Sequence, residues 1–179
     1  AGAYLMSPWL DLTVSEPSID ENIATDYLDR ELLDQLPDLQ WIARSGSGLD
    51  NIDVEAAHQK GIALHSSPEG NRDAVGEHTL GMLLNTLHRL SSGDASVRSG
   101  AWDREGHRGR ELKHLTVGII GYGHMGSAFA QRLAGFGCRV LAYDKYKEGW
   151  GEQPQVKAPL PHVVPVGSDV LAKEADVVS

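Results

Sequence analysis

Three glycines and an acidic residue in the second half of the sequence have the spacing of a dinucleotide-binding turn. Gly121, Gly123 and Gly126 form a G-x-G-x-x-G pattern between an apolar run and a helix-like pattern, and Asp144 follows the next apolar run. In this setting the first glycine permits a tight turn, the second lets the backbone approach a pyrophosphate, and the third lets the helix pack closely on a sheet. The N–H groups at the start of the helix would bind the phosphates. A glycine turn without a ligand is the alternative, but the order of strand, helix and acid favours dinucleotide binding.

The residues around this turn indicate which dinucleotide would bind. A carboxylate at Asp144 would accept hydrogen bonds from the ribose hydroxyls and repel a 2′-phosphate, which favours NAD over NADP. Lys145 and Lys147 follow directly and would weaken that preference. His124 and Met125 lie within the turn. His124 either faces the pyrophosphate or only fills the rim, and its place at the phosphate end makes it a poor candidate for catalysis.

Two loops in the first half of the sequence are further candidates. The stretch RSGSGLDNID (44–53) would present successive N–H groups to an anion such as a carboxylate, or would simply be a tight turn closing on Asp53 as a helix cap. The loop SPEGNRD (67–73) carries Asn71, which could form hydrogen bonds in a cleft. Glu77 and His78 follow on the first turns of a helix, where a polar pair at a helix interface is favoured over catalysis.

The elements that must position these residues alternate between helix and strand, which is typical of a parallel α/β fold. The expected helices share N-terminal caps or apolar periodicity, and they cover residues 29–36, 54–60, 74–90, 91–102, about 125–136 and 168–175. The expected strands are short apolar runs at 40–44, 62–66, 116–120, 139–143, 163–166 and 176–179. Residues 1–28 show no clear element, and 147–161 is expected to be a surface loop.

The helix expected at 74–90 is apolar on most sides, which predicts burial between domains or subunits. One stripe comprises Ala74, Val75, His78, Met82 and Leu83, and a second group, Leu80, Leu84 and Leu87, widens it.

Composition excludes several classes of function. The net charge of −9 disfavours non-specific binding to nucleic acid or to an anionic membrane. Cys138 is the sole cysteine, so an intrachain disulfide and a cysteine-rich metal site are excluded, and a small apolar side chain beneath a strand is its expected role. No apolar run approaches the roughly 20 residues of a membrane span. We expect a cytoplasmic protein, with both ends of the chain truncated, because it starts at Ala1 and stops inside a strand-like ADVVS.

Four segments together resemble the D-isomer-specific 2-hydroxyacid dehydrogenase family. They match it in order and spacing over about residues 29–146, and more loosely over 163–179: ARSGSGLDNIDVEAA…KGI, SPEGNRDAVGEHTLGMLL, G-x-W before a polar loop, and TVGIIGYGHMGSAFAQRLAGFGCRVLAYD. The resemblance implies an α/β protein with part of a flavodoxin-like substrate domain at 1–70. It also implies part of a Rossmann-type, parallel-sheet NAD-binding domain at 71–179, which includes the crossover and dimerisation helix 74–90. Within the family, the pattern is most similar to the branch that oxidises 3-phosphoglycerate.

The resemblance also implies roles for individual residues. NAD would be bound by Gly121, Gly123, His124, Met125, Gly126 and Asp144, with Val75 near the nicotinamide. A small 2-hydroxy or 2-oxo acid would be held by the backbone N–H groups of Ser45, Gly46, Ser47 and Gly48, by Asn71, and by the charge of Arg44. A homodimer would form through residues 73–110, with Trp102 filling a pocket of the partner.

The family transfers a hydride between nicotinamide and C2 of the acid, using a histidine, a carboxylate and an arginine that follow later strands. None of the eight histidines here stands in that position, so no catalytic residue is carried over. Two alternatives remain: a dinucleotide-sensing regulator of the corepressor type, and a truncated domain that folds with a partner but does no chemistry.

Overall fold

The computed structural model describes residues 28–150, 153 and 158–179. The chain divides into two compact units, Ala1–Asn71 and Arg72–Ser179. The expectations for residues 1–27 and for part of the loop at 147–161 lie outside the described residues.

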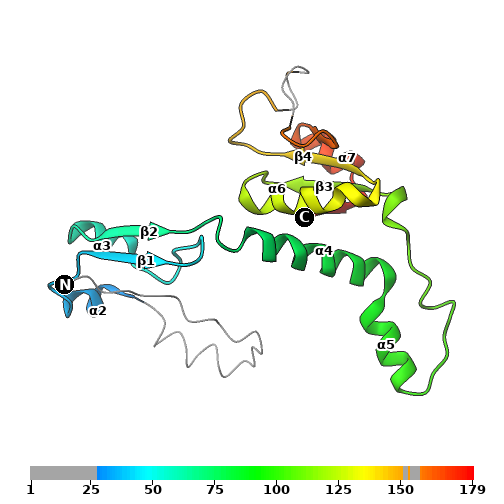
Figure 1. The fold of residues 1–179 in the computed structure, drawn as a ribbon, viewed down its shortest axis with the longest axis horizontal. Coiled ribbons are helices and arrows are strands. Elements are labelled where there is room, and N and C mark those ends of the chain that lie inside the picture. Colours follow the sequence, from blue (N-terminus) through cyan, green and yellow to red (C-terminus); the bar gives the residue numbers. More distant parts are fainter. Residues whose placement is uncertain (1–27, 151–152, 154–157) are drawn as a thin grey trace. The chain divides into compact units, whose positions relative to one another are not determined.

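The first unit alternates short helices and strands (Figure 1) in the order α2 (Arg30–Asp34), β1 (Trp41–Arg44), α3 (Val54–Gln59) and β2 (Ala63–Ser66). β1 and β2 pair in parallel. Each helix begins after an aspartate whose carboxylate accepts a hydrogen bond from a main-chain N–H group: Asp29 from Leu32, and Asp53 from Ala56, both at 2.8 Å. α3 is followed by Gly61, whose φ of +70° suits a residue without a Cβ. The expected cap at Asp53 and the parallel α/β order are therefore confirmed.

The second unit is built on a parallel sheet. Its strands, in chain order, are β3 (Thr116–Ile120), β4 (Arg139–Tyr143), β5 (Val163–Pro165) and β6 (Val177–Val178). They lie in the spatial order β5-β4-β3-β6, and every pairing is parallel. Strands covered on both faces need consecutive apolar residues, and this is the pattern of the two central strands, TVGII and RVLAY.

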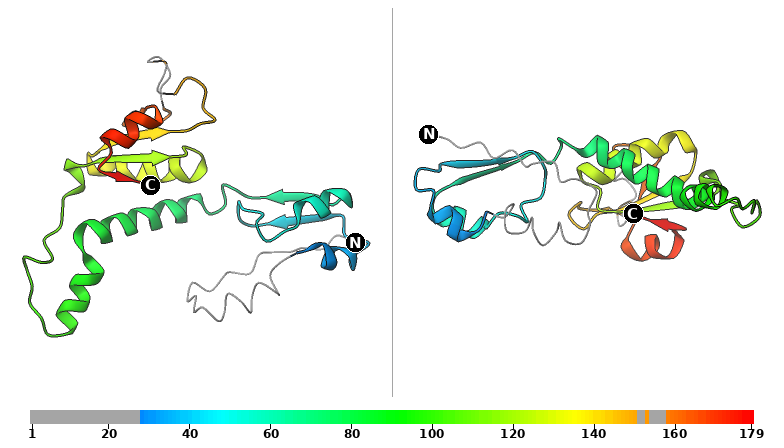
Figure 2. Two further views of the ribbon diagram at one scale, coloured as in Figure 1. Left: turned by 180° about the vertical axis from the view of Figure 1, so that it is seen from behind. Right: turned by 90° about the horizontal axis from the view of Figure 1, so that it is seen from below.

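Helices cover both faces of this sheet. α6 (His124–Leu133) packs on one face of the sheet and continues into the 3₁₀ turn η2 (Ala134–Phe136). α7 (Ser168–Glu174) packs on the other face. Side chains alternate along β4: Val140 and Ala142 pack in a cluster with Leu133 of α6, whereas Leu141 packs with Leu171 of α7. The view from below in Figure 2 shows α6 and α7 on opposite sides of the strands.

α4 (Arg72–His88) and α5 (Leu90–Arg98) precede the sheet, and the 3₁₀ turn η1 (Leu112–His114) leads into β3. Arg89 separates the two helices with a left-handed φ of 54°. The expected helices are confirmed, and only part of the apolar surface expected for α4 is packed in the single chain. Leu83 is buried and its neighbours Leu80, Leu84 and Leu87 pack partly against the core, whereas Ala74, His78 and Met82 are exposed. A helix that is apolar on most sides does not show in its sequence which side packs on a neighbouring element.

Candidate functional site

The three glycines of the turn after β3 differ in what a side chain would meet at each position. Gly121 has a φ of +90°, a conformation that a side chain disfavours. A Cβ on Gly126 would lie 2.0 Å from the carbonyl oxygen of Gly121, so the close approach of α6 excludes one. At Gly123 the backbone is extended, and a Cβ would meet no atom within 4 Å. Backbone conformation therefore explains Gly121, packing explains Gly126, and the space beside Gly123 is open for a ligand.

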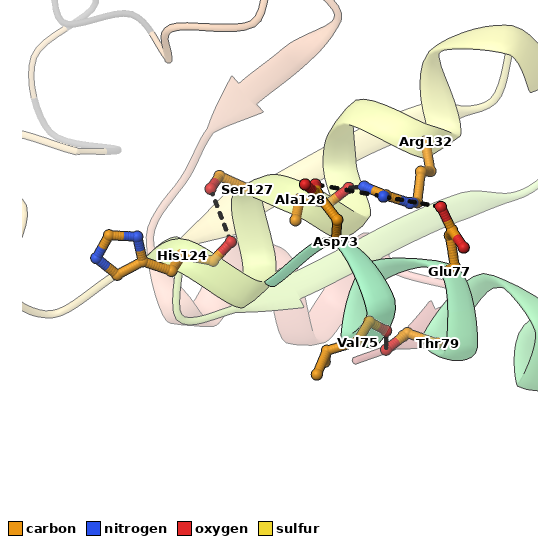
Figure 3. A network of polar contacts seen from close by, with 8 residues as sticks. All are labelled: Asp73, Val75, Glu77, Thr79, His124, Ser127, Ala128 and Arg132. Atoms are coloured by element: carbon orange, nitrogen blue, oxygen red, sulfur yellow. Dashed lines mark hydrogen bonds and ion pairs between the residues drawn. The ribbon is translucent and has the colours of Figure 1, made fainter. Parts of the chain in front are cut away.

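The start of α6 suits the phosphates of such a ligand. Gly123 is the N-terminal cap, and no side chain caps the helix there. The first N–H groups of a helix have no partner within the helix, and they carry a partial positive charge. His124 is the exposed first residue of α6 and Met125 is half-buried behind it. Figure 3 shows the His124 ring pointing away from the body of α6.

Asp144 lies directly after β4, where its carboxylate is held by two backbone N–H groups. One oxygen accepts from Tyr122 at 2.8 Å, and the other accepts from Tyr146 at 2.9 Å. A carboxylate has about four lone-pair sites, so acceptor capacity remains for two ribose hydroxyls. The two neighbouring lysines lie over aromatic rings: the Nζ of Lys145 is 4.7 Å from the Tyr146 ring centroid, and that of Lys147 is 5.6 Å from the centroid of Trp150.

Tyr122 is a residue that the sequence reasoning missed. Its N–H group joins the glycine turn to Asp144, and its ring packs 5.0 Å from that of Trp150. The side chain is buried, and burial raises the pKa of its hydroxyl, which has no hydrogen-bond partner among the described residues. An aromatic residue within a glycine motif was the available signal, because a large side chain beside two glycines must pack somewhere.

In the first unit, the substrate-site candidates lie at one edge of the sheet. The turn Ser45–Gly48 follows β1 and the loop ending at Asn71 follows β2, and these carboxyl ends of parallel strands meet. The two loops are in contact, because Ser67 N–H donates to the carbonyl of Gly46 at 3.2 Å. Neither Gly46 nor Gly48 has a positive φ, so the turn is not the αR–αL form of an anion nest. Its role toward a carboxylate stays a prediction.

Arg44 lies across this turn. Its Nη1 donates to the carbonyl of Gly48, and its buried Nε has no partner among the described residues. A guanidinium held beside the turn in this way would leave positive charge near any bound anion. Asn71, the last residue of the first unit, is exposed.

Val75 is half-buried near the start of α4, and polar residues of α4 and α6 form the contacts drawn in Figure 3. Glu77 and His78 do not pair with each other. Glu77 instead accepts from Arg132 of α6 at 3.2 Å, and His78 is exposed. Neighbouring helical residues point in different directions, so a pair between them was not available. The signal that the sequence reasoning missed was the i, i+4 spacing of Asp73 and Glu77, which places two carboxylates on one helix face.

Other kinds of site find no support in the part of the chain that the structure describes. No group of three or more metal-binding side chains occurs among the described residues. No described helix is long and apolar enough to cross a membrane. Cys138 is buried, and burial raises the pKa of its thiol, in line with its expected packing role.

A parallel sheet covered by helices on both faces, with a glycine turn leading from its first strand into α6 and an acid after the second, defines a Rossmann-type dinucleotide-binding domain. Residues 80–179 match the family model of the D-isomer specific 2-hydroxyacid dehydrogenase NAD binding domain, which is more than half of the chain. The chain therefore belongs to the D-isomer specific 2-hydroxyacid dehydrogenase family. The open space at Gly123 and the free acceptor capacity of Asp144 fit NAD as the cofactor.

The individual proteins that the chain resembles are named for different dehydrogenase and reductase activities. The chain is 41% identical over 119 residues to D-3-phosphoglycerate dehydrogenase of Mycobacterium tuberculosis, covering 66% of this chain and 22% of that protein. It is 34% identical over 149 residues to hydroxypyruvate reductase of Thermotoga maritima, covering 83% and 46%. A crystal structure of D-lactate dehydrogenase from Aquifex aeolicus with NAD and lactic acid superposes with a TM-score of 0.71 at 33% identity, covering 86% and 44%. The chain thus spans less than half the length of these proteins.

Proposed function

We propose that the full-length protein is an NAD-dependent oxidoreductase that transfers a hydride between nicotinamide and C2 of a D-2-hydroxy acid. The open space beside Gly123, in a chain of this family, is the observation that carries the proposal. The pyrophosphate would lie on Gly121, Gly123 and Gly126, with His124 and Met125 at its rim. Asp144 would bind the ribose, and Val75 would contact the nicotinamide.

The first test is cofactor binding by the full-length protein. Titration calorimetry with NADH and NADPH should show the tighter binding for NADH, because the Asp144 carboxylate would repel a 2′-phosphate. Failure of both cofactors to bind would overturn the proposal.

The acid substrate would be held by the loops at the carboxyl edge of β1 and β2. Backbone N–H groups of Ser45–Gly48 would bind its carboxylate and Asn71 its oxygen atoms. The charge of Arg44 favours a substrate with a second anionic group, and a 3-phosphoglycerate dehydrogenase is among the relatives. We therefore favour 3-phosphoglycerate over the smaller acids that hydroxypyruvate reductase and D-lactate dehydrogenase relatives would indicate.

Steady-state assays separate these substrates. NAD is offered with 3-phosphoglycerate, D-glycerate or D-lactate, and NADH with hydroxypyruvate or glyoxylate. The highest kcat/KM should be with 3-phosphoglycerate, and Arg44→Met should lower that value while sparing D-lactate. Turnover of a simple acid with none of 3-phosphoglycerate would overturn the substrate assignment, and NADH binding without turnover of any acid would favour a dinucleotide sensor.

A second copy of the chain is the proposed partner, through residues 73–110. Four large apolar side chains of this segment are more than half exposed in the single chain: Met82, Leu90, Val97 and Trp102. A protein with apolar side chains gathered on one segment tends to cover them in an interface. Sedimentation of the full-length protein at micromolar concentration should show a dimer, which Trp102→Asp weakens. Tyr146→Asp is the matched control, because both aromatic side chains are 84% exposed. A monomeric wild-type protein would overturn this assignment.

A further inference from the structure

The first two turns of α4 are attached to the second unit with almost no apolar packing. From Arg72 to Glu77, only Gly76 is buried, and Val75 is half-buried. The large side chains that join α4 to the core, from Leu80 to Leu87, lie farther along the helix. The helix start therefore has no large apolar side chains of its own that pack on the core.

A single arginine of α6 binds this helix start from two directions. Arg132 Nη2 lies 3.3 Å from an oxygen of Asp73 and 3.2 Å from an oxygen of Glu77, while Nη1 donates to the carbonyl of Ala128 at 2.9 Å (Figure 3). Its side chain is 17% exposed, whereas those of Asp73 and Glu77 are 67% and 74% exposed. The guanidinium is thus enclosed between the two helices, and its planar fork has a defined orientation.

The helix backbones approach each other closely at the same point. A Cβ on Gly76 would lie 3.0 Å from the carbonyl carbon of Ala128 and 3.1 Å from Nη1 of Arg132. Gly76 lies between Asp73 and Glu77 in the sequence, so the close contact and both ion pairs involve the same turn of α4. Thr79 adds a local bond, its hydroxyl donating to the carbonyl of Val75 at 2.8 Å.

Stability alone does not account for this arrangement. Ion pairs whose carboxylates are largely exposed contribute about 0–1 kcal/mol, because water solvates and screens them. Their effect on geometry follows from their arrangement: two carboxylates one helical turn apart share Nη2 of a guanidinium whose Nη1 is bound to Ala128, which limits rotation of that turn of α4.

We propose that Arg132 is a positioning residue: by binding Asp73 and Glu77 it fixes the first two turns of α4 on the cofactor helix and so sets where Val75 meets the nicotinamide. The inference rests on the proposed function, in which Val75 contacts that ring. Arg132 itself touches neither cofactor nor substrate in this proposal. Its removal should therefore affect the geometry of hydride transfer more than the affinity for NADH.

The test compares full-length wild-type protein with Arg132→Met and Arg132→Lys, using its best acid substrate. Arg132→Met keeps most of the apolar stem and should lower kcat about tenfold, since small displacements of reacting groups have effects of this size. The NADH Kd should change less than about threefold, because the phosphate and ribose contacts remain. The primary isotope effect on kcat should rise as hydride transfer becomes slower, measured with the hydroxy acid deuterated at C2, or with NADH deuterated at C4 when the oxo acid is reduced. Arg132→Lys should be intermediate, because an ammonium keeps the charge but loses the fork.

A second set of variants tests the same ion pairs from the carboxylate side, in case Arg132→Met does not fold. Asp73→Asn/Glu77→Gln alters exposed side chains and should reproduce the loss of kcat, and adding Arg132→Met should cause little further loss, since the groups act as a unit. Arg139→Met is the matched control, because it breaks another inter-element pair of the same unit, with Glu174 at 2.7 Å. It should leave kcat and the isotope effect unchanged.

The results distinguish this inference from the proposed function. Wild-type turnover together with an unchanged kcat and isotope effect in Arg132→Met, even with a lower Tm, would overturn the positioning role alone. The same loss of kcat in Arg139→Met would overturn it as well. Absence of NADH binding by the wild-type protein would overturn the proposed function and this inference with it.

Discussion

Replacing single glycines of the turn by alanine separates ligand binding from folding. At Gly123 the φ of −86° suits alanine and its Cβ would meet no protein atom within 4 Å, so the variant should fold with a free energy of unfolding within about 1 kcal/mol of wild type. The methyl group would instead enter the space proposed for the pyrophosphate. Overpacking of this kind costs about 1–3 kcal/mol, which corresponds to an NADH affinity lowered roughly 5- to 150-fold.

Gly126→Ala should show the opposite behaviour. Its Cβ would lie 2.0 Å from the Gly121 carbonyl oxygen, a backbone atom that cannot move without opening the turn. We expect a loss of about 1–3 kcal/mol in unfolding free energy, even after the gain in helix propensity from alanine.

Urea unfolding and NADH calorimetry on both variants measure the two effects. Gly135→Ala in η2 is the matched control, because its Cβ would also meet nothing within 4 Å, and it should alter neither quantity. Wild-type NADH affinity in Gly123→Ala would refute the idea that the cofactor occupies this space. Wild-type stability in Gly126→Ala would refute the close approach of α6 to the turn.

Three further predictions concern the neighbouring residues. Asp144→Ala should lower the ratio of NADPH to NADH dissociation constants at least about tenfold, because a negative charge beside the 2′-phosphate is removed, and calorimetry with both cofactors measures it. Burial raises the pKa of Tyr122 above its ordinary 10.0 and that of Cys138 above 9.0. Each group therefore ionises at a lower pH in the unfolded chain than in the folded protein. Its contribution to stability is complete below the ordinary pKa and is lost as the pH rises through the folded pKa. Urea titrations at rising alkaline pH should show this loss, and Tyr122→Phe should reduce it; an equal loss in that variant would contradict the assignment. Asp53→Ala should lower the unfolding free energy by about 1 kcal/mol through loss of the cap of α3, as judged by thermal unfolding, and an unchanged Tm would contradict it.

The local elements could be predicted because their signals are local. Asp29 and Asp53 cap the helices that follow them, and Gly61 and Gly137 have the positive φ values expected where a helix has ended. Parallel pairing followed from strands and helices in alternation, since a parallel connection needs a crossover. The cofactor turn followed from spacing combined with Asp144, which lies after the paired strand.

Contacts between distant elements could not be predicted in the same way. Arg132 binds residues 59 and 55 positions earlier in the chain, and no periodicity connects them. The packed side of α4 could not be predicted for a related reason. Its start approaches α6 at Gly76, where the missing side chain permits close contact, whereas Leu80 to Leu87 pack farther along the helix. A glycine inside a helix is a weak signal until the facing helix is known.

The contrast among Gly121, Gly123 and Gly126 shows what structure adds to a glycine motif. Each glycine is compatible with a turn that binds nothing, so spacing leaves both readings open. Gly121 is explained by its backbone conformation and Gly126 by contact with the chain itself, so neither is evidence for a ligand. Gly123 has an ordinary conformation and empty space around the position of its missing Cβ, so neither strain nor crowding requires glycine there, and a serine or aspartate would cap α6 at least as well. The structural argument for a bound dinucleotide therefore rests on Gly123, where neither conformation nor packing requires glycine. It rests also on the Asp144 carboxylate, which the N–H groups of Tyr122 and Tyr146 orient.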